Sequence, residues 1–121
     1  MAEIAFAEAV EAPGLQAAIR RELDRETLRS ERLRAAYQST LPIAGRDGTL
    51  ELRMKGTAAE GRALVKTGSM NGVRTAAGYV QTADGQPLAF AIFANNFANS
   101  SALINAATDD IIVRLASYRS R

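Results

Sequence analysis

The sequence predicts an α+β fold, a three-strand antiparallel meander flanked by N-terminal and C-terminal helices. Apolar residues recur at helical spacing in the first forty residues and again after Ser100. Between these two stretches the pattern is typical of β-strands, and two turn signals, Asn71-Gly72 and Asp84-Gly85, divide it into three. A chain of 121 residues is near the commonest domain size and can bury a core.

Residues 1–40 are predicted to be a helical N-terminal segment. Between residues 14 and 39 the apolar side chains recur mostly at steps of three to five among Arg and Glu, as on one or two surface helices. Pro13-Gly14 marks the start of this pattern. The mixed charge of residues 20–34 is typical of the solvated face of a helix.

A loop and a short element come next. Residues 41–48 read as a Pro/Gly loop. Residues 49–55 alternate in a way that fits a strand as well as a short helix capped by Asp47 or Thr49. We favour the helix.

The three strands are expected over residues 62–69, 73–82 and 87–94. The third is a nearly continuous apolar run, which predicts burial on both faces. In the second strand Ala76, Ala77 and Gly78 have little side chain, so a helix or a ligand can approach its backbone closely.

The last element is a helix with Ser100 or Ser101 as its N-cap, and we expect it to cover the sheet. Asp109-Asp110 are adjacent on it and point about 100° apart, so they are expected to be solvated rather than to act as paired acids. The apolar stripe predicted to face the sheet consists of Leu103, Ile104, Ala107, Ile111, Ile112 and Leu115.

The composition excludes several classes of function. The net charge is only +2 and the arginines are interleaved with acidic residues, so nucleic acid is not indicated. The absence of Cys and His removes Cys/His metal sites, cysteine nucleophiles and Ser-His-Asp triads, and we predict no metal and no cofactor. The chain shows no signal-peptide pattern and no apolar stretch of membrane-spanning length.

The triplet Lys66-Thr67-Gly68 ends a predicted strand just before the Asn71-Gly72 turn. The triplet alone is weak, because any strand can end in an exposed lysine. In serine penicillin-binding proteins and β-lactamases, however, Lys-Thr-Gly is the third motif, beside a Ser-x-x-Lys nucleophile and a Ser-x-Asn element. There it lies on a strand at the edge of the active site, which is the placement predicted here.

Residues 42–96 resemble the C-terminal part of the serine D-Ala-D-Ala carboxypeptidase/endopeptidase family, the class C low-molecular-mass penicillin-binding proteins. The resemblance rests on AGRDGTL (residues 44–50), GTAAEG (56–61), KTGS (66–69), GYV (78–80) and ADG (83–85). It implies that residues 41–121 are the C-terminal part of a penicillin-binding domain with a partial transpeptidase fold. It also implies peptidoglycan peptides ending in D-Ala-D-Ala as substrates and a periplasmic or cell-envelope location.

The resemblance gives four adjacent residues a role. Lys66 would place a cation over the carboxylate of the terminal D-Ala, and the Thr67 hydroxyl would donate a hydrogen bond to it. Gly68 would let the substrate backbone lie close to the strand. Ser69 would contribute its backbone N–H to an oxyanion hole. The substrate would pair with the edge of the strand.

The sequence departs from the family at the nucleophile. No serine is followed by a lysine three residues later. Ser69-Met70-Asn71 matches the second motif literally but overlaps the third, so we interpret it as a coincidence. The chain is therefore interpreted as a C-terminal fragment of such an enzyme, inactive alone, with β-lactams bound only by the full-length protein.

The alternative from another functional class is a non-catalytic module for binding peptidoglycan peptides or for self-association as a homo-oligomer. Carboxypeptidase and endopeptidase activity both remain open for the full enzyme.

Overall fold

The computed structural model describes residues 3–4, 17, 21 and 31–121. The chain divides into two compact units, one of residues 6–40 and one of residues 1–5 and 41–121. In the first unit, helix α2 spans Glu31–Ser39, within the predicted helical segment. The rest of that predicted segment lies almost entirely outside the described residues.

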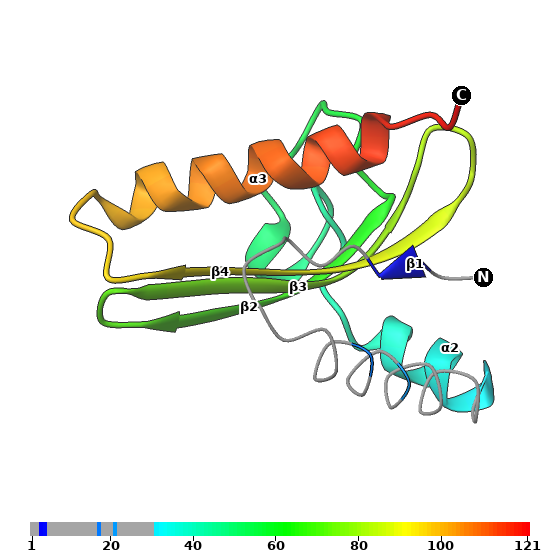
Figure 1. Ribbon diagram of the computed structural model, residues 1–121, viewed down its shortest axis with the longest axis horizontal. Helices are drawn as coiled ribbons and strands as arrows, with labels where there is room; N and C mark the ends of the chain where they lie inside the picture. The colour runs from blue at the N-terminus through cyan, green and yellow to red at the C-terminus, as the bar shows by residue number, and fades with distance from the viewer. Residues whose placement is uncertain (1–2, 5–16, 18–20, 22–30) are drawn as a thin grey trace. The chain divides into compact units, whose positions relative to one another are not determined.

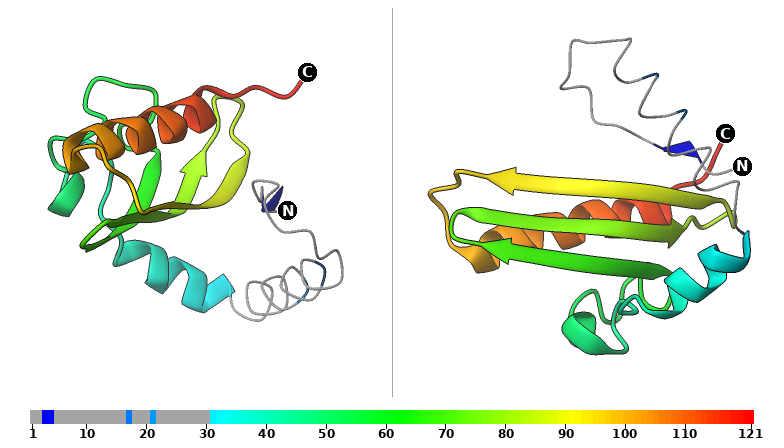
Figure 2. Two further views of the ribbon diagram at one scale, coloured as in Figure 1. Left: turned by 60° about the vertical axis from the view of Figure 1, so that its left-hand side comes forward. Right: turned by 90° about the horizontal axis from the view of Figure 1, so that it is seen from below.

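The second unit contains a four-stranded sheet with the order β1-β4-β3-β2 (Figure 2). Strands β2 (Ala63–Met70), β3 (Val73–Gln81) and β4 (Pro87–Asn95) pair antiparallel along the chain, which confirms the predicted meander. Strand β1 (Glu3–Ile4) pairs parallel with Leu88 and Ala89 of β4 and was not predicted. Two residues are too few to show an alternating pattern.

Helix α3 (Ser101–Ser117) lies across one face of this sheet and packs mainly on β3 (Figure 1). Ser100 is its N-cap, since the hydroxyl of Ser100 accepts a hydrogen bond from the Leu103 N–H at 3.2 Å. The predicted stripe is partly wrong, because Leu103 and Ile111 are 55% and 45% exposed. The side chains that the sheet covers most completely recur every four residues: Thr108, Ile112 and Ala116.

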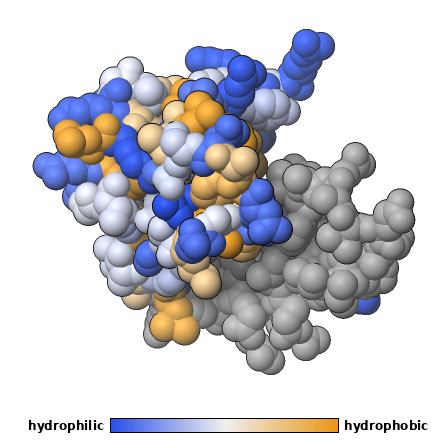
Figure 3. Space-filling view, turned by 90° about the vertical axis from the view of Figure 1, so that its left-hand side faces the viewer, coloured by the Kyte–Doolittle hydropathy of each residue, from blue (hydrophilic) through white to orange (hydrophobic). Residues whose placement is uncertain are grey.

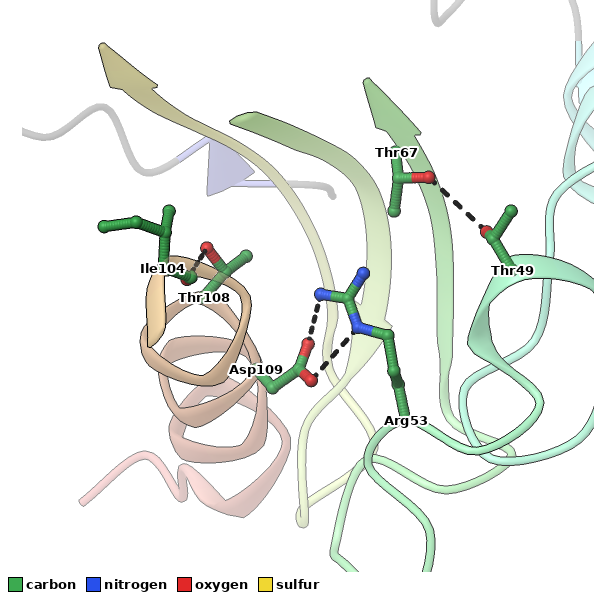
Figure 4. Close-up of polar contacts among 6 residues, drawn as sticks. All are labelled: Thr49, Arg53, Thr67, Ile104, Thr108 and Asp109. Carbon is green, nitrogen blue, oxygen red and sulfur yellow. Dashed lines mark hydrogen bonds and ion pairs between the residues drawn. The ribbon is translucent and has the colours of Figure 1, made fainter. Parts of the chain in front are cut away.

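Thr108 is buried among apolar residues because its hydroxyl has a partner. It donates to the carbonyl oxygen of Ile104, one turn earlier, at 2.9 Å (Figure 4). A hydroxyl that is bonded within its own helix can be buried without losing a hydrogen bond. A stripe chosen by hydrophobicity alone therefore misses this position.

The core lies between α3, the sheet and the segment of residues 44–59, with Leu50, Val65, Val80 and Ile112 fully buried. The prediction that the third strand is buried on both faces is wrong. Phe90 of β4 is 8% exposed, whereas Phe93 is 69% exposed. Neighbouring side chains of a strand point to opposite faces, and within the described residues α3 covers only the face that carries Phe90.

The segment before β2 is a loop fixed by the core rather than a regular helix. Its only helical turn is the 3-10 helix η1 (Gly48–Leu50), and the Leu50 side chain is fully buried. The Asp47 carboxylate does not cap this turn but accepts a hydrogen bond from the Ile43 N–H at 2.6 Å. The expected short helix is thus reduced to one turn, because the following residues approach the core through Met54 and Ala59.

Small residues in β3 allow two neighbouring elements, α3 and β2, to pack closely against this strand. Ala76 is 2% exposed on the face that α3 covers, as expected for close helix packing. Gly78 is constrained by the adjacent strand, since a Cβ atom there would lie 1.9 Å from the carbonyl oxygen of Leu64. Any side chain at residue 78 would push β2 and β3 apart.

The chain after α3 is tied to the β3–β4 turn through Asp84. The Thr82 hydroxyl donates to this carboxylate at 2.5 Å, and the hydroxyl and N–H of Ser120 donate at 2.7 and 3.0 Å. These hydrogen bonds hold the pKa of Asp84 well below its usual range, and the hydrogen bond from Thr82 has the largest effect. The N–H of Ala83 also donates to the carbonyl oxygen of Tyr118 at 3.1 Å.

We predict that Asp84→Asn lowers the melting temperature at pH 7 and that the difference from the parent chain narrows as the pH falls toward 3. In the unfolded chain this carboxyl titrates at its ordinary pKa of about 4. Because the folded pKa is lower, the stabilisation is complete above pH ~4 and is lost as the pH falls below that value. Thermal melts between pH 7 and pH 3 measure the difference, with Asp110→Asn, an exposed carboxylate of α3, as the matched control. A constant difference down to pH 3 would contradict the assignment.

Candidate functional site

The outer edge of β2, the edge away from β3, is closed in its first half and open in its second. The Val65 N–H donates to the carbonyl oxygen of Pro42 at 2.9 Å, and the Ala44 N–H donates to that of Ala63 at 2.9 Å. Backbone groups of alternate residues point to the same edge of an antiparallel strand. The N–H groups of Thr67 and Ser69 therefore point to this outer edge, where the described residues offer them no partner.

Lys66 and Thr67 bring a cation and a hydroxyl to the start of the open edge. Their side chains leave β2 on opposite faces, as neighbours on a strand do. The exposed Lys66 bends back to the edge, so that its Nζ donates to the carbonyl oxygen of Thr67 at 2.6 Å. No ion pair of Lys66 is found within the part of the chain that is described. Its charge is thus available to an anion at the edge.

Thr49 lies beside Thr67, although the two residues are eighteen positions apart in sequence. The Oγ1 atoms of Thr49 and Thr67 are 3.4 Å apart, and either can be the donor (Figure 4). Thr49 is exposed at the middle of η1, whereas its neighbour Leu50 is fully buried. The buried leucine fixes the turn that presents the threonine.

The loop that carries Thr49 is also tied to α3 by an ion pair. The Arg53 guanidinium donates two hydrogen bonds to the Asp109 carboxylate, from Nε at 3.1 Å and from Nη2 at 2.7 Å (Figure 4). The side chains are 23% and 19% exposed. The prediction that Asp109 is solvated is therefore wrong, because the loop of residues 51–60 supplies a partner that no helical pattern reveals.

Arg74 supports the other end of the open edge. It is the cross-strand partner of Ser69, and its Nη1 donates to the carbonyl oxygens of Met70 and Val73, both at 2.7 Å. Its Nη2 donates to the Ser101 hydroxyl at 2.6 Å. The guanidinium so joins the β2–β3 turn to the start of α3.

Gly68 lies between the two open-edge residues and faces away from α3. A Cβ atom at this position would lie 2.3 Å from Oγ1 of Thr75, its cross-strand partner. The neighbouring strand therefore constrains residue 68, in addition to the space that a ligand at the edge would need.

The site can bind an anion and an extended backbone. It offers the Lys66 ammonium, the Thr49 and Thr67 hydroxyls, and the N–H groups of Thr67 and Ser69, which have no partner among the described residues. Residues 31–121 contain no group of three or more His, Cys, Asp or Glu side chains that could bind a metal ion. Within that part of the chain, no helix is long and apolar enough to span a membrane.

A family model of the D-Ala-D-Ala carboxypeptidase 3 (S13) family matches residues 16–118. The chain belongs to this family. The match includes helix α2, strands β2 to β4 and α3, so it extends further toward the N-terminus than the motifs on which the resemblance was based.

Individual relatives support the same assignment. A D-alanyl-D-alanine carboxypeptidase of Actinomadura sp. (strain R39) is 45% identical over 87 residues, which make up 68% of this chain and 16% of that protein. Penicillin binding protein 4 from Haemophilus influenzae is 29% identical with a TM-score of 0.60, over 67% of this chain and 20% of that one.

A second structure of the Haemophilus influenzae protein, complexed with a novel β-lactam, has a TM-score of 0.64 at 25% identity and covers 80% of this chain and 24% of that one. The S13-family chain described here thus spans less than a quarter of the length of these proteins.

Lys66, Thr67, Gly68 and Ser69 all lie at or next to the open half of the β2 edge. The sequence analysis quoted Thr49 within a family-like stretch and considered it as a helix cap, but gave it no role in binding. Arg74 was missed as well. A basic residue just after a hairpin turn is the only signal it offers, and such residues are common at the surface.

We predict that Gly68→Ala destabilises this S13-family chain by about 1–2 kcal/mol, because the new methyl group meets Oγ1 of Thr75. The double variant Gly68→Ala/Thr75→Ala should recover most of this loss, since the Thr75 Cβ would still be 3.7 Å away. Urea unfolding gives the three free energies of unfolding.

Gly78→Ala is the matched comparison for this pair. Its methyl group would meet backbone atoms of Leu64 and Val65, so no side-chain change nearby can relieve it and the loss should be larger. Equal losses for Gly68→Ala with and without Thr75→Ala would show that the hydroxyl is not the obstacle.

Proposed function

We propose that this chain is the part of a serine-type D-Ala-D-Ala carboxypeptidase/endopeptidase that binds the carboxylate and backbone of a peptidoglycan peptide. Membership of the S13 family supports the reaction class. The open edge of β2 carries the proposal, because Lys66, Thr67 and Ser69 reach it from one short stretch. By family, the full enzyme acts on the cell wall, in the periplasm or cell envelope.

The roles follow from the groups at the edge. Lys66 and the Thr67 hydroxyl bind the terminal carboxylate, and such charge-assisted hydrogen bonds are the stronger kind. The N–H of Ser69 is the oxyanion donor, and Gly68 allows the peptide backbone to lie against the strand. The peptide adds to β2 as a further strand.

We also propose that the chain by itself does not catalyse the reaction. Acylation needs a serine whose proton is taken by a neighbouring base, and no serine of this sequence has a lysine three residues later. An oxyanion donor without a nucleophile cannot form the ester. Covalent binding of β-lactams therefore belongs to the full-length enzyme.

The first experiment measures binding and acylation separately. Titration with a short peptide ending in D-Ala-D-Ala should shift the amide signals of Thr67 and Ser69 in the NMR spectrum. Lys66→Met should weaken binding at least about tenfold, since the hydrogen bond to a charged group is lost. Lys55→Met, which changes an exposed lysine outside the edge, is the control.

Fluorescent penicillin should not label the same sample covalently. No shift at Thr67 and Ser69 would overturn the binding proposal, and a penicilloyl adduct found by mass spectrometry would overturn the proposed inactivity.

The alternative function, self-association, is favoured by a different observation. On the sheet face opposite α3, Met70 and Phe93 are 72% and 69% exposed. Figure 3 shows the end of the sheet near the β2–β3 turn, where hydrophobic patches alternate with polar ones. Exposed apolar surface beside an open strand edge favours association between copies.

We expect sedimentation velocity to show a concentration-dependent rise in mass, because association would bury this face. Phe93→Lys should abolish the rise. Leu52→Lys, which removes a side chain that is 82% exposed outside the sheet, should leave it unchanged. A mass that stays monomeric at every concentration rules out the self-association module.

A further inference from the structure

We infer that residues 42–49 form an end wall of the peptide-binding edge, and that the Thr49 hydroxyl is a further ligand for the terminal carboxylate of the peptide. This inference rests on the proposed function. It adds a binding residue and a structural requirement, namely that the bound peptide ends in a free carboxylate at this wall.

The direction of the peptide follows from the two groups that it must meet. Its scissile carbonyl lies at Ser69, and its terminal carboxylate lies at Lys66 and Thr67. The peptide therefore runs from Ser69 toward Lys66, antiparallel to β2. One residue further along, the outer edge of Val65 is already bonded to Pro42 at 2.9 Å. A peptide that paired beyond Thr67 would have to displace this segment.

The wall is firmly built. Ala44 is fully buried. Its N–H donates to the carbonyl oxygen of Ala63, and its carbonyl oxygen accepts from the Gly61 N–H, both at 2.9 Å. The turn closes with the Gly45 N–H donating to the carbonyl oxygen of Leu50, whose side chain is fully buried. Opening the wall would break these bonds and expose core side chains.

Thr49 is placed to share the carboxylate with Thr67. Its hydroxyl is exposed, and its Oγ1 lies 3.4 Å from that of Thr67 in the structure without a ligand. That distance is long for a hydrogen bond between hydroxyls, so the pair is poorly satisfied by itself. A carboxylate has two oxygen atoms and accepts several hydrogen bonds, so both hydroxyls and Lys66 can donate to it at once.

This arrangement discriminates among peptides by their ends. A C-terminal amide has lost one charged acceptor and presents N–H groups to two hydroxyls and an ammonium. A peptide lengthened by glycine after the second D-Ala must place the extra residue where Pro42 and Thr49 lie. Both should bind much more weakly than the free acid, even though they keep the same backbone pairing groups.

The test uses the full chain and NMR titration with three peptides and two protein variants. The probes are a short peptide ending in D-Ala-D-Ala, its C-terminal amide, and the same peptide extended by glycine. The protein variants are Thr49→Val, which removes only the hydroxyl while keeping the shape, and Thr49→Ser, which keeps the hydroxyl. Thermal melts confirm that both variants fold like the parent.

We expect the amide and the extended peptide to bind at least about tenfold more weakly than the free acid. Thr49→Val should weaken binding of the free acid about five- to tenfold and leave binding of the amide unchanged, while Thr49→Ser should bind like the parent. A purely structural role of Thr49 would weaken both ligands equally.

The outcomes separate this inference from the proposed function. If the parent chain binds the free acid and Thr49→Val binds it equally well, the carboxylate role of Thr49 is overturned and the proposed function stands. If the extended peptide binds as well as the free acid, the end wall is overturned. If the parent chain does not bind the free acid, the proposed function is overturned, and the role of Thr49 with it.

Discussion

The point on β2 at which backbone pairing stops is the constraint on which the rest of the site depends. Up to Val65 the strand is bonded on both sides, to β3 and to the segment of Pro42 and Ala44. From Thr67 onward the described residues pair with its backbone on one side only. An unpaired edge attracts another strand, and a paired one excludes it. This boundary thus decides where a peptide can add and where it must end.

The core and α3 hold in place the segment that ends the pairing on the outer edge of β2. Leu50 is fully buried in the core, and Arg53 is paired with Asp109 of α3. A half-buried bidentate ion pair of this kind fixes the position of the loop better than a single exposed contact would. Its net contribution to stability is modest. The C-terminal helix therefore supports the edge through a loop that precedes the strand in sequence.

Patterns of local origin were predictable from the sequence. The Asn71-Gly72 and Asp84-Gly85 turns predicted a meander because each joins neighbouring strands, and the N-cap was expected at Ser100 or Ser101, of which the structure has Ser100. Contacts between distant residues were not predictable. Asp109 resembles a solvated acid until Arg53 is brought beside it, and Thr49 shows no pattern that would place it beside Thr67. The burial of Thr108 and the exposure of Phe93 depend on which face meets α3, and only the assembled fold determines that.

The strand β1 introduces a kinetic asymmetry into the sheet. β2, β3, β4 and α3 follow one another along the chain, so their contacts can form by closing short loops, which is fast. β1 pairs through two residues near the start of the chain with Leu88 and Ala89, and closing so long a loop costs entropy that two residues repay poorly. From these loop lengths we expect β1 to join the sheet after the other three strands have paired, and to be the first strand to separate when the sheet opens from that side.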